Sequence, residues 1–338
     1  MGASRRRLTR LMLTIRCSAE RAHNTRRKKK PIGELLEPRL KLVVDLIRSL
    51  PHLEHLELTV WPFPLKDETT NRSVAVLAEA IKGSRLCALT LNNVEPDSAK
   101  SRALASLLKA AAGLVELNLV NTRSLGKHKA VTDAFEALDQ VRSLSLIDAD
   151  PVNDTWAMLE FKSPLNALTF KDCRYLTLPA LYNITECTAL SLKSLTVDNC
   201  TRLDADLAAD ADFEALPPLS RLVDAKVSSF SASILRLFDA CDALESLELS
   251  APKKKKVSGA VTADSLAAFI KGHSKLKRLT IGQGFYHLVT SAAFTSTLKS
   301  CATEHGVTLV DAVPRPQPRI TSYSTGRRRR GRCARSSS

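Results

Sequence analysis

The sequence has few of the residues and motifs that enzyme sites need. Aromatic residues make up only 5% of its 338 positions, and its seven histidines show no metal-ligand spacing to cysteine or carboxylate side chains. There is no G-x-x-x-x-G-K-S/T phosphate loop, no G-x-G-x-x-G after a strand and no H-E-x-x-H. We therefore expect no enzyme activity, no cofactor and no bound metal.

Long hydrophobic runs and paired cysteines are absent as well. No run approaches the roughly 20 apolar residues of a membrane-spanning helix, and the apolar stretch 11–15 ends at Arg16, too short for a secretory signal. The eight cysteines are scattered without a C-x-x-C pair, which is typical of reduced thiols. These absences predict a nuclear or cytoplasmic protein that does not bind a membrane.

The positive charge lies towards the two ends of the chain. The net charge is +15, but residues 1–50 hold 14 basic against 4 acidic side chains and residues 311–338 hold 8 against 1, so residues 51–310 are close to neutral. We predict a basic disordered tail over 1–33 and a Pro/Arg-rich disordered tail over 314–338. Such tails bind nucleic acid weakly and without specificity. The first tail also suits nuclear import or a mitochondrial presequence.

One phrase, L-x-x-L-x-L, recurs between these tails. Its clearest copy is the stretch from Leu114 to Leu119. The Leu-x-Leu pair puts two side chains on one face of a short strand, and the leucine three positions earlier enters the same core. Seven further copies begin at Leu53, Leu86, Val141, Leu165, Leu192, Leu244 and Leu276. A degenerate copy begins at Leu219 and has Asp224 in place of its third apolar residue.

A period of roughly 24 to 33 residues built on this phrase resembles the leucine-rich repeat family. Helical spacing follows several copies, as at Leu104, Leu107 and Leu108. The resemblance implies an α/β fold over residues 34–313, a leucine-rich repeat solenoid or horseshoe with a parallel concave sheet and outer helices. A helix predicted over 34–50 should cap the open edge of the first strand.

Two cysteines indicate one variety of this family. Cys173 and Cys200 stand at the ninth position of their repeats, which resembles the cysteine-containing, ribonuclease-inhibitor-like repeats, where a buried thiol closes the strand exit. Such repeats are common in F-box substrate receptors, which serve cullin–RING ubiquitin ligases through a Skp-type adaptor. Pro31-x-x-Glu34-Leu35-Leu36 resembles the opening of an F-box, but the first repeat begins too soon for the rest of that motif.

Asn or Asp stands at the eighth position of five copies, at Asn93, Asn121, Asp148, Asp172 and Asn199. One interpretation is local, because short Asx side chains suit the turn where a strand leaves the sheet. The other is a polar ladder along a binding rim. The recurrence of Asn or Asp at the same position of each repeat favours the turn interpretation, because a turn by itself is enough to require a short polar residue at that position.

The alternate strand positions predict the binding surface. They face the concave side and carry both signs of charge among small polar residues, which suits a protein partner better than the single positive stripe that nucleic acid prefers. The candidate protein-binding residues are Glu57, Asn92, Asn118, Arg142, Lys171, Asp198, Glu248 and Arg278. We therefore predict a protein-interaction module, conceivably the substrate-recognition subunit of an F-box-type ligase.

A second candidate site is the run Lys253, Lys254, Lys255 and Lys256. It resembles a short nuclear-import signal, which an import receptor binds in an acidic groove, although four lysines also keep a loop in water. The alternative function is accordingly a nuclear scaffold or nucleic-acid-associated factor that uses its Arg/Lys-rich tails. Both import patterns favour a nuclear over a cytoplasmic location.

Overall fold

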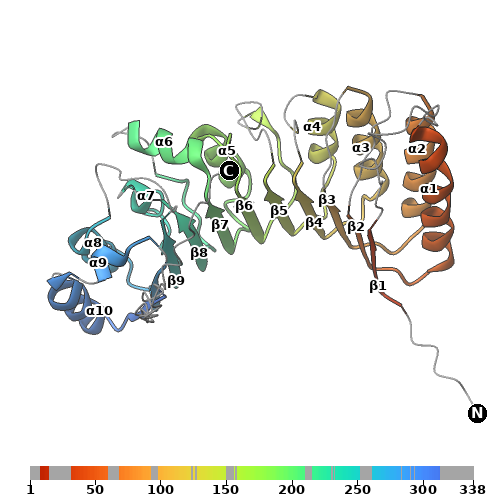
Figure 1. The fold of residues 1–338 in the computed structure, drawn as a ribbon. Helices are drawn as coiled ribbons and strands as arrows, with labels where there is room; N and C mark the ends of the chain where they lie inside the picture. Colours follow the sequence, from red (N-terminus) through yellow and green to blue (C-terminus); the bar gives the residue numbers. More distant parts are fainter. Residues whose placement is uncertain are drawn as a thin grey trace, which may run out of the picture.

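The structure, a computed structural model, describes most of the region between the two tails. The described residues are 8–14, 32–59, 68–92, 98–122, 125, 128–149, 156, 158–209, 215–229, 231, 233–251, 261–282, 284–289, 291–292 and 294–312. They form one open, parallel sheet of eleven strands that neighbour one another in chain order. Figure 1 shows an arc with the strands along its inner side and the helices along its outer side. The expected α/β fold with a parallel sheet and outer helices is confirmed, and it is compatible with a leucine-rich-repeat-like solenoid.

The described strands are five residues long, except the last two, which have four. They are β1 (Arg10–Thr14), β2 (His55–Thr59), β3 (Ala88–Asn92), β4 (Glu116–Val120), β5 (Ser143–Ile147), β6 (Ala167–Lys171), β7 (Ser194–Asp198), β8 (Asp224–Ser228), β9 (Ser246–Ser250), β10 (Arg278–Ile281) and β11 (Thr308–Asp311). The helices are α1 (Ile32–Ser49), α2 (Glu68–Lys82), α3 (Ser98–Ala110), α4 (Lys129–Glu136), α5 (Leu178–Cys187), α6 (Thr201–Ala209), α7 (Ser233–Arg236), α8 (Ala263–Gly272), α9 (Tyr286–Val289) and α10 (Lys299–Glu304), with a π-helix at Phe294–Leu298.

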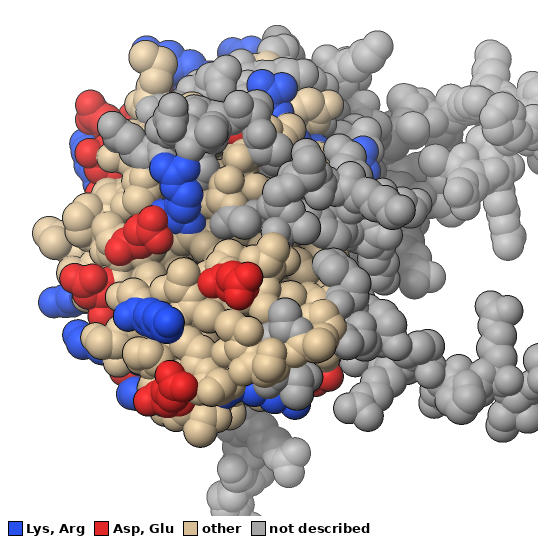
Figure 2. All heavy atoms as spheres, turned by 90° about the vertical axis from the view of Figure 1, so that its left-hand side faces the viewer, with Lys and Arg blue, Asp and Glu red and all other residues tan. Residues whose placement is uncertain are grey.

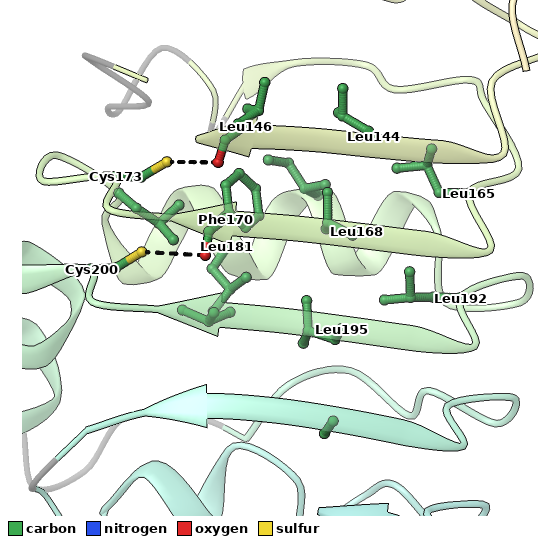
Figure 3. Close-up of a cluster of buried hydrophobic side chains, with 14 of the residues drawn as sticks. Leu144, Leu146, Leu165, Leu168, Phe170, Cys173, Leu181, Leu192, Leu195 and Cys200 are labelled. Carbon is green, nitrogen blue, oxygen red and sulfur yellow. Dashed lines mark hydrogen bonds between the residues drawn. The ribbon is translucent and has the colours of Figure 1, made fainter. Parts of the chain in front are cut away.

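The strand register aligns the repeated leucines into layers. Leu117 of β4 lies opposite Leu144 of β5, which lies opposite Leu168 of β6. All three are buried, because alternate residues of a strand point to the same side and this side faces the helices. Figure 3 shows the layers from β5 to β7. Each buried leucine contributes roughly 1.5–3 kcal/mol, so neighbouring repeats stabilise one another.

Helix α8 begins with a capping box at Thr262. The Oγ1 of Thr262 accepts the N–H of Ser265 at 3.1 Å, and the hydroxyl of Ser265 accepts the N–H of Thr262 at 3.0 Å. This reciprocal capping box satisfies two backbone donors that the first turn of α8 would leave unpaired. The helix then buries Leu266, Phe269 and Ile270 against the sheet layers.

The prediction that a helix caps the first strand is wrong. Residues 10–14, which the charge pattern assigned to the N-terminal tail, form β1, and Leu11 lies opposite Leu56 of β2. Leu8, Leu11 and Leu13 are in fact a further copy of the repeated phrase. A parallel strand bonds to the backbone groups of the β2 edge, which a helix cannot do, and α1 packs against α2 instead.

The predicted copy at Leu219 is wrong by three residues. Ala225 pairs with Leu195 and Val227 pairs with Val197, so the copy begins at Leu222 and all its apolar residues are buried. The error arose because Leu219 and Leu222 are themselves three residues apart and alanine is a weak match to the phrase. Asp224 therefore lies on the free side of the sheet and does not interrupt the core.

One repeat has lost its helix in the described part of the chain. Between β5 and β6 the described residues contain only short turns, and Trp156 is fully buried there. Its ring centroid lies 5.1 Å from that of Phe135 of α4, with the planes tilted by 60°. This aromatic pair packs the segment between β5 and β6 against α4.

Candidate functional site

The free side of the sheet, opposite the leucine layers, presents three rows of side chains, and we call it the inner face. The amino and carboxyl rows lie two residues before and two residues after the middle row on each strand. The middle row consists of Met12, Glu57, Thr90, Asn118, Ser145, Thr169, Thr196, Lys226, Glu248, Thr280 and Val310. No helix in the described part of the chain crosses this face (Figure 1).

Seven of the eight predicted binding residues lie in these rows. The middle row holds Glu57, Asn118 and Glu248, the carboxyl row holds Asn92, Lys171 and Asp198, and the amino row holds Arg278. Arg142 lies one residue before β5, where its N–H donates to the carbonyl of Val115 at 2.7 Å and its side chain is exposed. The register thus brings the predicted residues to one surface, while their role in binding stays a prediction.

On β3 and β4 the polar side chains of the inner face bond to one another and to β2. The Nδ2 of Asn92 donates to Glu57 Oε1 at 3.4 Å. The Nδ2 of Asn118 donates to Glu116 Oε1 at 2.7 Å and to Thr90 Oγ1 at 3.2 Å. Both carboxylates therefore already accept a hydrogen bond within the face.

On β8 to β10 two lysines are paired with glutamates, whereas Asp224 of β8 has no side-chain partner in the described part of the chain. Lys226 Nζ lies 2.6 Å from Glu248 Oε1, and Lys277 Nζ, just before β10, lies 2.8 Å from Glu245 Oε2. The Nε of Arg278 donates to Thr280 Oγ1 at 3.3 Å. Figure 2 looks onto the C-terminal end of the arc and not onto the inner face, and the described part of that end shows acidic and basic side chains interspersed rather than gathered by sign.

The centre of the inner face, on β5 to β7, differs from both flanks. Five charged side chains in and beside this centre have no hydrogen bond or ion pair with the rest of the described chain: Lys171 and Asp198 in the carboxyl row, and Arg142, Asp148 and Lys193 at exposed positions one residue outside β5 or β7. The same holds for the hydroxyl groups of Ser143, Ser145, Thr169, Ser194 and Thr196. These three strands therefore offer a ligand both charged and hydroxyl groups.

The Asx positions at the strand exits are turn residues. Asn121, Asp148, Asp172 and Asn199 have φ between 48° and 56°, a left-handed conformation that Asn and Asp tolerate better than other side chains. The N–H of Asp148 donates to the carbonyl of Lys171 at 2.7 Å, and that of Asp172 donates to the carbonyl of Asp198 at 2.8 Å. The backbone angles agree with a turn at these four positions, while the bonding of their side chains to nearby backbone stays a prediction and Asn93 lies outside the described residues.

The two repeat cysteines are buried at strand exits, as expected. The Sγ of Cys173 lies 3.3 Å from the carbonyl oxygen of Leu146, and that of Cys200 lies 3.9 Å from the carbonyl oxygen of Phe170 (Figure 3). A hydrogen bond to Cys173, together with burial, raises the pKa of the Cys200 thiol well above its ordinary value. Cys200 therefore stays protonated and acts as a structural donor rather than a nucleophile.

A groove of about 560 Å³ lies on the outer side of the arc, between α7 and α8. Its floor includes Leu235, Phe269 and His273, and Arg236 and Asp239 line it as well. Both ring nitrogens of His273 lie 2.9 Å from backbone carbonyl oxygens, so the ring is enclosed by the backbone and its N–H donates within the protein. Among the described residues, no set of three or more His, Cys, Asp or Glu side chains is arranged to hold a metal ion.

No protein-family model matches this chain, and no curated protein matches it. None of the helices that the structure describes combines the length and the apolar character needed to span a bilayer. The predicted import signal, Lys253 to Lys256, lies outside the described residues. Sequence reasoning missed Lys226, because the register error at Leu219 moved it off the inner face, although Val227 marks the correct register.

Proposed function

We propose that this chain is a non-catalytic, leucine-rich-repeat-type module that holds a partner protein on its inner face. The observation that supports this is an uncovered sheet face whose central strands carry polar side chains without a partner in the described chain. Eleven strands about 4.8 Å apart and about 16 Å long present roughly 800 Å², which is close to the area that each partner buries in a typical protein–protein interface.

Capture of bound proteins from native cells tests this proposal. Thr169 lies in the middle row with no bond to lose, so Thr169→Trp should block a partner without unfolding the sheet. Lys271→Trp on the outer helix α8 is the matched control. We expect a partner that the wild type and the control retain and the Thr169 variant loses. Equal recovery with both variants, at unchanged unfolding midpoints, would contradict binding at the inner face.

Within this class, we propose a substrate-recognition subunit of an F-box, cullin–RING type ligase. The buried thiols of Cys173 and Cys200 at the strand exits support it, because the resemblance to cysteine-containing repeats rests on these positions. Mass spectrometry of the captured complex should find a Skp-type adaptor or a cullin. If a partner is recovered without an adaptor or a cullin, the ligase proposal is excluded and the more general proposal of protein binding remains.

The alternative is a nuclear scaffold or nucleic-acid-associated factor, and the partition of charge favours it as the second candidate. The basic residues concentrate in 1–50 and 311–338, whereas the repeats are near neutral. Affinity for an RNA probe should then fall by roughly 10³ or more between 50 and 200 mM salt if six or more phosphates are contacted. Deleting residues 1–33 would also remove β1, so the variant should instead replace residues 26–30 with glutamine and delete residues 314–338. If this variant keeps its affinity for the RNA probe, the tails are not what binds the RNA. Nuclear accumulation should fall when Lys253 to Lys256 become alanine.

A further inference from the structure

We propose that the centre of the inner face binds one short partner segment that is acidic at one end and basic at the other. The segment runs parallel to β5, β6 and β7, with its acidic end at the amino ends of these strands and its basic end at their carboxyl ends. This inference rests on the proposed protein-binding function and adds the chemistry and the direction of the partner. It follows from the distribution of unpaired charge across these three strands.

Cations stand at the amino edge of the centre. Arg142 and Lys193 precede β5 and β7, and Asn166 lies between them. Backbone bonds stack the three positions, because Asn166 N–H donates to the carbonyl of Arg142 and Lys193 N–H donates to that of Asn166, at 2.7 and 2.8 Å. Both cationic side chains are exposed, so this edge attracts an anionic group.

Carboxylates lead at the opposite edge. Asp148, Asp172 and Asp198 stand at the exits of β5 to β7, where one cation, Lys171, accompanies them. Asp172 accepts a bond from Asn199 at 2.6 Å, whereas Asp148 and Asp198 have no partner among the described residues. The edge therefore keeps a net negative charge and attracts a cationic group.

The area between the edges is uncharged and narrow enough for one segment. Asp148 follows Arg142 by six positions, and a strand rises about 3.3 Å per residue, so the edges lie roughly 20 Å apart. The amino and middle rows in between carry only Ser143, Ser145, Ala167, Thr169, Ser194 and Thr196. Small side chains let a backbone approach closely, and the free hydroxyl groups can bond to it.

The charge pattern selects the class of occupant. A nucleic acid or a wholly acidic peptide would meet unpaired carboxylates at the carboxyl edge, and a wholly basic peptide would meet Arg142 and Lys193 at the other. A segment with both signs in separate blocks compensates each edge. On the flank from β8 to β10, Lys226 and Lys277 are already paired with Glu248 and Glu245, and Asp224 is an unpaired carboxylate, so this flank attracts an anionic group less than the amino edge of the centre does.

Three synthetic peptides of equal length test this on the full chain by fluorescence anisotropy. The block peptide joins three glutamates to three lysines through about six Gly/Ser residues, the second alternates the same charged residues, and the third replaces the glutamates with lysines. We expect the block peptide to bind roughly five-fold more tightly than either of the others. Equal binding of the block and alternating peptides, or tightest binding of the all-lysine peptide, would overturn the proposal.

Protein variants locate the effect. Arg142→Glu with Lys193→Glu should weaken the block peptide roughly ten-fold, whereas Lys271→Glu with Lys299→Glu on outer helices changes net charge equally and should leave it unchanged. A nitroxide on the glutamate end should broaden the NMR signals of Arg142 and Lys193, not those of Asp148 and Asp198. Broadening at the carboxyl edge, or equal loss in both variants, would refute the proposed direction.

The outcomes separate this inference from the proposed function. If Thr169→Trp abolishes capture of a native partner while the charge variants and the block peptide show no effect, protein recognition stands and the proposed polarity is wrong. If Thr169→Trp also has no effect on capture, the inner face is not the binding surface and both proposals fail.

Discussion

The buried side of the sheet repeats the same side chains from strand to strand, whereas the inner face changes at almost every strand. Leu117, Leu144 and Leu168 occupy equivalent places in three successive layers. On the opposite side, the middle row reads Asn118, Ser145, Thr169 and Thr196 over β4 to β7, with charged residues further along. Both sets of side chains belong to the same strands in the same register. They differ because one set packs against the helices and the other is uncovered.

This contrast shows that packing constrains the residues on the buried side, whereas binding can constrain those on the inner face. A buried layer must match its two neighbours in shape, so one solution recurs along the arc. An exposed row has no such neighbour, and its residues are free to suit a ligand. The places where the inner face departs from its own flanks, as at Arg142 and Asp198, are therefore the informative ones for function.

The largest expected difference is between two adjacent residues of β6. Phe170 is fully buried between Leu146 and Val197, and Phe170→Ala should lower the free energy of unfolding by about 3–5 kcal/mol. Thr169, one residue earlier, faces the other way, and Thr169→Ala should change it by less than about 0.5 kcal/mol. Urea unfolding of both variants checks this. Similar losses would mean that the two sides of the sheet are not energetically distinct.

The buried side could be predicted from the sequence, because its rule is periodic. A phrase with two apolar residues on one strand face locates the layers and, through them, the parallel sheet and the outer helices. The rule failed at Ala225, where a small residue takes the place of leucine, and at Leu11, where surrounding arginines suggested a tail. At both places the L-x-x-L-x-L pattern is present, but the residue types in or around it made it hard to recognise.

The inner face could be predicted only in part. Alternation placed Glu57, Asn118 and Glu248 on it correctly, but which side chains pair with each other depends on distances between neighbouring strands. The pair of Lys226 with Glu248 needs the register of β8, and the unpaired state of Lys171 beside Asp198 needs their actual geometry. No periodicity carries that information.

A polar residue on the buried side tests the contrast further. His273 is buried, with Nδ1 2.9 Å from the carbonyl oxygen of Phe269 and Nε2 2.9 Å from that of Phe238. His273→Ala removes the ring N–H that donates to one of these carbonyls and should cost about 1–3 kcal/mol of unfolding free energy. His305→Ala, at an exposed histidine, is the control and should cost little. A loss below about 0.5 kcal/mol at His273 would show that polar groups here need no partner.

Alkaline pH probes the same side through a thiol. Burial, with Asp242 and Asp239 nearby, raises the pKa of Cys241 from 9.0 to about 11. Its neutral form is favoured in the folded chain, so this contribution is fully present below pH 9 and is lost as the pH rises towards 11. The wild type should lose about 2 kcal/mol more than Cys241→Ala between these values, measured as unfolding free energy against pH. Parallel curves for the two proteins would contradict the assignment.

The smallest effect is expected on the inner face, at the ion pair of Lys226 and Glu248. The two groups lie 2.6 Å apart, but their side chains are 44% and 39% exposed, and solvent screens such pairs strongly. A double-mutant cycle with Lys226→Ala and Glu248→Ala should give a coupling of about 0.5 kcal/mol that shrinks in high salt. A coupling several times larger and insensitive to salt would make this pair part of the stabilising framework, and the division between a buried side that holds the fold and an inner face left free for a ligand would no longer apply at β8 and β9.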